Sequence, residues 1–114
     1  LTCFMLLAFT VPTHAASGTD YGDGFTLKGT ISDTTIQGTA TGTNSSNVNV
    51  ALTSVKYRIK NYNKLKEAAS KSGMSYVYYY SSSLNEPNFT KFESVKIIGT
   101  LLSNGHTAIV SLSN

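Results

Sequence analysis

The segment that most constrains the fold spans residues 48–60, the longest stretch in which apolar and polar side chains alternate. Its apolar residues occupy even positions in the first half and odd positions in the second. Successive residues of a strand point to opposite faces of a sheet. The change of parity at Thr53-Ser54 therefore predicts either one long strand re-aimed by a bulge or two strands that meet there. Both alternatives make a β-sheet the framework of the chain.

A short apolar run near the start of the chain has the pattern of a secretory signal peptide. Residues 4–11 are predominantly apolar and are followed by Pro12 and by the small residues Thr13 and Ala15. The run is far shorter than the ~20 apolar residues that a membrane span needs. We therefore expect a signal peptide over residues 1–15, cleaved after Ala15, and a secreted or surface-associated product. A buried N-terminal strand or helix is the alternative.

The expected cleavage also determines the length and the cysteine content of the product. Of the 114 residues it leaves 114 − 15 = 99, which suits one domain with a modest core. It removes Cys3, the only cysteine, so the product is expected to be free of disulfides. Small secreted eukaryotic domains usually depend on disulfides, and this composition therefore favours a bacterial exported protein.

The next part of the chain predicts a leader and a first hairpin. Residues 16–24 are rich in glycine and small polar residues and are expected to form a flexible leader before a single domain over residues 25–114. Residues 25–31 and 36–41 both alternate, and a polar turn separates them at residues 32–35. This pattern predicts two antiparallel strands.

After residue 60 the spacing of apolar residues changes. Leu65, Ala68 and Ala69 recur at three- and four-residue intervals, and Gly73 follows them. The interval predicts a short helix over residues 63–72.

The clearest turn signal lies near the end of the chain. Asn104-Gly105 separates two alternating segments and predicts a tight hairpin with a two-residue turn. Folding the chain about this pair places Leu101 opposite Ala108.

These segments define the expected fold class, which is mainly β. They predict a small antiparallel sandwich or open barrel of about six strands, with one short helix between the third and fourth strands. A flat sheet with the helix on one face is the alternative.

The charge of the chain is concentrated in one segment. The net charge is +3, and six of the nine basic residues fall within residues 56–71, which contain a single acid, Glu67. Such a segment can attract anions, although charge runs are also typical of an ordinary solvated face. The predicted binding residues are Lys56, Arg58, Lys60, Lys64, Lys66 and Lys71.

A run of tyrosines supplies a second candidate surface. Tyr76, Tyr78 and Tyr80 share one face of a predicted strand, and Val77 and Tyr79 share the other. An exposed row of three phenol rings would stack on sugar rings or bind a protein. We expect instead that at least two of the three pack in the core, because aromatic rings are the largest apolar groups in a chain without tryptophan.

The remaining residues offer few parts for catalysis. Without residues 1–15, His106 is the only histidine and no cysteine remains, so a nucleophilic triad lacks its parts. Glu86 and Glu93 are the only close acidic pair in loop-like sequence, and Asp20 and Asp23 lack the further acids of a calcium loop. We expect neither an enzyme nor a metal or cofactor site.

These observations favour a small secreted bacterial binding module. Its expected partner is an anionic cell-wall polymer, a glycan or an acidic protein at the cell surface, contacted through the basic residues with or without the tyrosines. Export disfavours nucleic acid as a partner. The alternative is a secreted effector, either a bacteriocin-like protein or an inhibitor of an extracellular enzyme.

Overall fold

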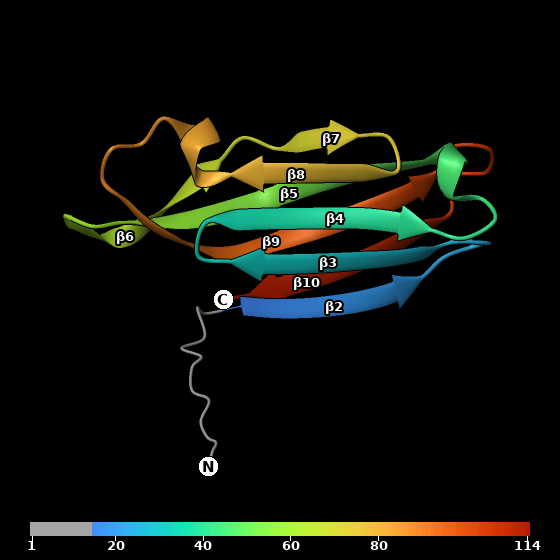
Figure 1. Ribbon diagram of the computed structural model, residues 1–114, viewed down its shortest axis with the longest axis horizontal. Helices are drawn as coiled ribbons and strands as arrows, with labels where there is room; N and C mark the ends of the chain where they lie inside the picture. The colour runs from blue at the N-terminus through green and yellow to red at the C-terminus, as the bar shows by residue number, and fades with distance from the viewer. Residues whose placement is uncertain (1–14) are drawn as a thin grey trace, which may run out of the picture.

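The computed structural model describes residues 15–114 and contains two antiparallel β-sheets that pack face to face (Figure 1). Buried apolar side chains from both sheets form one core between them. The prediction of a mainly β antiparallel sandwich is confirmed, with nine strands in the described range where about six were expected. The expected signal peptide lies outside the described residues except for Ala15, and Cys3 lies outside them too.

The first sheet has four strands. They are β2 (Ala15–Tyr21), β3 (Thr26–Ser32), β4 (Thr35–Thr41) and β8 (Tyr76–Tyr80), in that spatial order. The hairpin expected for the second and third of these strands, β3 and β4, is confirmed. Strand β2 occupies most of the region expected to be a flexible leader, because it pairs with the free edge of β3 along its whole length.

The second sheet has five strands. They are β10 (Thr107–Ser113), β9 (Phe89–Leu101), β5 (Val48–Ile59), β6 (Tyr62–Ala68) and β7 (Lys71–Gly73). The spatial order is β10-β9-β5-β6, and β7 pairs with the N-terminal half of β5 on the same side as β6. The remaining regular elements are two single turns of 3-10 helix, η1 (Ser45–Asn47) and η2 (Ser81–Leu84).

The expected helix over residues 63–72 is wrong, because this segment forms β6 and β7. Strand β5 is twelve residues long and offers one edge to both of them. An isolated helix of this length is marginal unless it buries an apolar face, and the alanines of this segment provide little to bury. Pairing with β5 satisfies the backbone hydrogen bonds instead.

Of the two alternatives expected for residues 48–60, the structure contains the single strand with a bulge. Ser54 has a positive φ of 51°, and the register with β9 shifts between Thr53 and Lys56. The extra residue changes which parity faces inward. The apolar residues of both halves of the strand consequently reach the same core.

The hairpin between β9 and β10 forms with a different register from the expected one. Ala108 pairs with Gly99 rather than with Leu101, and the Leu101 N–H donates to the His106 oxygen at 2.8 Å. Residues 102–105 therefore form a longer loop in which only Gly105 has a positive φ, 75°. The Asn104 side chain holds this loop, because its Oδ1 accepts from the His106 N–H at 2.9 Å.

Candidate functional site

The tyrosine row, defined as Tyr76, Tyr78 and Tyr80, stands on the outer face of β8. These side chains are 58%, 39% and 51% exposed, whereas Val77 and Tyr79 are buried. The expectation that at least two of the three tyrosines pack in the core is therefore wrong. Tyr79 takes the core position and packs against Phe92 at a ring-centroid distance of 6.1 Å.

The rings of the tyrosine row contact one another along the strand. The Tyr76 and Tyr78 centroids are 5.8 Å apart with planes at 63°, and the Tyr78 and Tyr80 centroids are 6.4 Å apart with planes at 10°. Such contacts restrict the rings and add to their stability. The row is therefore one continuous aromatic surface rather than three separate side chains.

The tyrosine row borders a sheet face that can form hydrogen bonds. Strand pairing places Thr35, Gln37 and Thr39 of β4 beside Tyr80, Tyr78 and Tyr76. The next strand, β3, continues this face with threonines, and Lys28 is the one charged residue at the outward positions of the four strands as described. Aromatic rings and uncharged polar groups thus lie together on one surface.

The outer face of the five-stranded sheet carries a different chemistry. Strand pairing places Lys91 beside Arg58 and Lys96 beside Thr53, so β5 and β9 together present basic residues on one face. We define the basic face as Lys56, Arg58, Lys91 and Lys96. Lys91 and Lys96 were not among the predicted site residues, because the sequence does not reveal that β9 neighbours β5.

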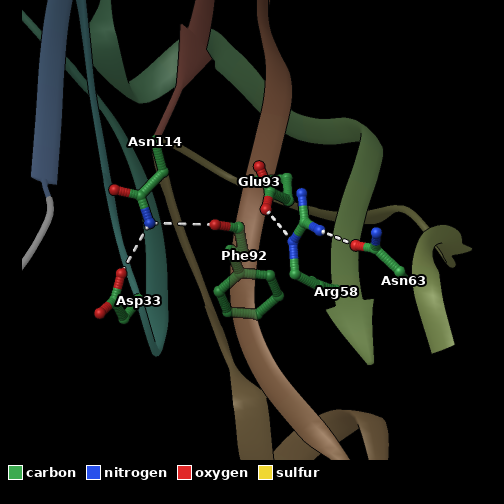
Figure 2. Close-up of polar contacts among 6 residues, drawn as sticks. All are labelled: Asp33, Arg58, Asn63, Phe92, Glu93 and Asn114. Atoms are coloured by element: carbon green, nitrogen blue, oxygen red, sulfur yellow. Dashed lines mark hydrogen bonds and ion pairs between the residues drawn. The ribbon is translucent and has the colours of Figure 1, made fainter. Parts of the chain in front are cut away.

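Arg58 is held in place by a network that Figure 2 shows. Its Nε donates to Glu93 Oε2 at 2.6 Å, and its Nη1 donates to Asn63 Oδ1 at 2.9 Å. The Glu93 carboxylate is half-buried and neutralises part of the charge of the basic face. Arg58 is therefore preorganised but is not a free cation.

The other predicted basic residues do not extend this face. Lys66 and Lys71 pair in register with the inward-facing Tyr57 and Leu52, so they lie on the opposite side of the sheet from Lys56. Lys66 Nζ lies 3.4 Å from Glu86 Oε1.

Lys71 and Lys64 each lie over an aromatic ring. Lys71 Nζ lies 5.2 Å from the centroid of the Tyr79 ring, and Lys64 Nζ lies 5.6 Å from that of Tyr62. Burial raises the pKa of Tyr79, and the nearby Tyr57 adds to this effect. Lys60 is exposed in the turn that follows β5. The six predicted basic residues are thus divided between the two faces of the sheet and the turn after β5.

A second set of polar contacts in Figure 2 is structural. Asn114 Nδ2 donates to Asp33 Oδ1 at 2.9 Å and to the Phe92 oxygen at 3.0 Å. The Phe92 N–H in turn donates to the backbone oxygen of Asp33 at 3.0 Å. These bonds tie the turn between β3 and β4 to β9, so they connect the two sheets at one end of the sandwich.

An open depression of about 540 Å³ lies at the end of β8, just beyond the tyrosine row. It is lined by Ser81, Ser82, Asn85, Glu86, Pro87 and Phe89. No histidine reaches it, and His106 lies exposed in the loop between β9 and β10. Within residues 15–114, no group of three or more His, Cys, Asp or Glu side chains gathers to hold a metal. None of the helical turns described there has the length and apolar character needed to cross a membrane.

Comparison with protein-family models, with curated proteins and with solved structures found no match.

Proposed function

We propose that this domain is a small exported binding module that holds a polysaccharide at a cell surface through the tyrosine row. The observation that carries the proposal is the exposure of three neighbouring phenol rings beside Gln37 and threonines. The axial C–H groups of a sugar ring pack on aromatic faces, while its hydroxyls need donors and acceptors at the side. The arrangement on β4 and β8 supplies both.

The tyrosine row suits binding better than the rest of the surface does. Tyrosine presents a large, rigid area and loses little side-chain freedom when it binds. The four-stranded sheet supports the row, because β8 pairs with β4 and Tyr79 anchors it to the core. A preformed face of this kind matches an extended glycan chain.

The test is retention of the purified protein on insoluble cellulose, chitin and peptidoglycan. We expect retention on at least one of these polymers, little affected by 1 M salt because no ion pair is involved. Tyr78→Ala should lower the affinity about tenfold or more, since it removes the central ring. The matched control is Tyr21→Ala, which removes a tyrosine outside the row that is more exposed than Tyr78, 74% against 39%. Equal effects of the two substitutions would refute the role of the row.

A second candidate function follows from the basic face. Lys56, Lys91 and Lys96 lie on one face of two neighbouring strands, and within residues 15–114 none of them forms an ion pair. We propose an anionic cell-wall polymer as the alternative partner. Binding through this face would be lost at high salt and weakened by Lys96→Glu, whereas Tyr78→Ala would leave it unchanged.

A further inference from the structure

Strand β6 is unusual because neither of its faces is covered. All of its residues except Ala68 are exposed, including Tyr62 at 55% and Leu65 at 45%. Figure 1 shows β6 at one end of the sandwich, where it extends beside β5. The strand is therefore held by pairing with β5 rather than by burial of its side chains.

The outer edge of β6 has no partner strand among residues 15–114. In the five-stranded sheet β6 is the last strand of the order, so the backbone groups on its outer side face solvent. An exposed edge of this kind accepts an added strand from another chain, with backbone hydrogen bonds supplying affinity and alternate side chains supplying specificity. The exposed Tyr62 and Leu65 offer apolar contact on either face.

The charges of β6 oppose pairing with a second copy of the same strand. In such a pair, β6 of one copy would lie antiparallel to β6 of the other, and the two five-stranded sheets would form one continuous sheet with their outer faces on the same side. In the register centred on Leu65, Lys64 of each copy lies opposite Lys66 of the other. In registers centred on either lysine, that lysine lies opposite itself. Like charges placed directly opposite each other destabilise a strand pair.

The same lysines favour a different strand. We propose that β6 is a docking edge for an extended acidic segment of a partner protein, which joins the five-stranded sheet as an additional strand. Alternate carboxylates of the added strand would lie beside Lys64 and Lys66, on the side of the sheet that Lys66 shares with Tyr57. Lys66 keeps 47% of its side chain exposed although it pairs with Glu86, so it remains accessible.

The test uses the full domain and a blocked synthetic peptide in which Glu alternates with Val. Fluorescence anisotropy should show binding that weakens as salt rises, and backbone NMR should show slowed amide exchange in β6. Lys64→Glu combined with Lys66→Glu should lower the affinity about tenfold or more. The matched control combines Lys28→Glu with Lys96→Glu, which changes the net charge equally but lies on the two outer faces. A peptide in which Lys alternates with Val should not bind.

A single substitution tests whether the edge is competent to pair. Lys64→Glu places a carboxylate opposite Lys66 in the register centred on Leu65, so this variant should form dimers that sedimentation detects. Dimers of the variant together with no binding of the acidic peptide by the unmodified domain would overturn the proposal, because the lysines would then only protect the edge. Equal loss of peptide binding in the control variant would also overturn it.

Discussion

The most direct test of the packing between the two sheets uses Gly29 and Gly38, which face the same isoleucine, Ile97. A Cβ atom at Gly29 would lie 2.5 Å from Ile97 Cδ1, and one at Gly38 would lie 2.8 Å from Ile97 Cγ2 and 3.0 Å from Val50 Cγ1. Ile97 is fully buried in the core. Each Gly→Ala substitution therefore forces the two sheets apart or forces Ile97 out of its conformation.

The expected magnitude follows from two opposing effects. Overpacking of a well-packed core costs roughly 1–3 kcal/mol. The reduced freedom of the unfolded chain offsets about 0.4–1 kcal/mol of this when alanine replaces glycine. Gly29→Ala and Gly38→Ala should each lower the free energy of unfolding by about 1–2 kcal/mol. For a domain of this size each kcal/mol corresponds to about 4–8 °C in Tm.

Ile97→Val distinguishes the contact at Gly29 from the contact at Gly38, because it removes Cδ1 and keeps both γ carbons. Alone, it should cost about 0.5–1.5 kcal/mol. Combined with Gly29→Ala, Ile97→Val removes the closest contact of the new Cβ atom. The loss of unfolding free energy in this double variant should therefore be about 1 kcal/mol smaller than the sum of the two single losses. Combined with Gly38→Ala, Ile97→Val leaves the Cγ2 contact in place, and the effects should add within about 0.5 kcal/mol.

The assay is urea unfolding of the three single variants, the two double variants and the unmodified domain, followed by far-UV circular dichroism. Equal m-values would show that the comparison concerns stability rather than the unfolded state. Equal coupling of Ile97 to both glycines, or no coupling to Gly29, would refute this account of the packing.

Two further predictions concern polar contacts between the sheets. The Ile109 N–H donates to Asp20 Oδ2 at 2.9 Å and, with the Tyr21 N–H, lowers the pKa of Asp20 below its ordinary value of 3.8. Because the folded-state pKa of Asp20 is lowered, the ionised carboxylate stabilises the fold above pH 3.8, and this stabilisation is lost as the pH falls through the folded-state pKa. Asp20→Asn should therefore flatten the acid side of a curve of unfolding free energy measured from pH 2 to 6. An unchanged curve would show that the Asp20 carboxylate does not stabilise the fold. Asn114→Ala removes two hydrogen bonds to Asp33 and Phe92 and should cost about 1–2 kcal/mol in urea unfolding, whereas exposed Ser113→Ala should cost about 0.5 kcal/mol or less.

The local patterns of the sequence predicted the fold class and the most distinctive strand. The parity change at Thr53-Ser54 limited residues 48–60 to a bulged strand or two strands that meet there, because the side-chain period of a strand is two and an inserted residue reverses it. The first hairpin followed from the same alternation. These features depend on neighbouring residues alone, which is why a single sequence contained them.

The features that the sequence did not reveal depend on tertiary pairing. The segment after residue 60 has helical spacing, but the free edge of β5 provides hydrogen-bond partners that a short exposed helix lacks. The same pairing divides the predicted basic residues between faces and brings Lys91 and Lys96 beside Arg58 and Thr53. The exposure of the tyrosine row likewise depends on β8 being uncovered on its outer side.

The two proposed surfaces differ in how firmly the fold holds them. The chain enters β8 through Met74 and Ser75, whose oxygens accept from the Val50 N–H at 2.8 Å and the Ala40 N–H at 2.7 Å. Because Val50 belongs to one sheet and Ala40 to the other, the start of the tyrosine row is bonded to both sheets. Strand β6 pairs with β5 alone, and Ala68 is its one residue that packs against the core. A rigid face suits a preformed glycan surface, whereas an uncovered edge suits a partner segment that becomes ordered as it pairs.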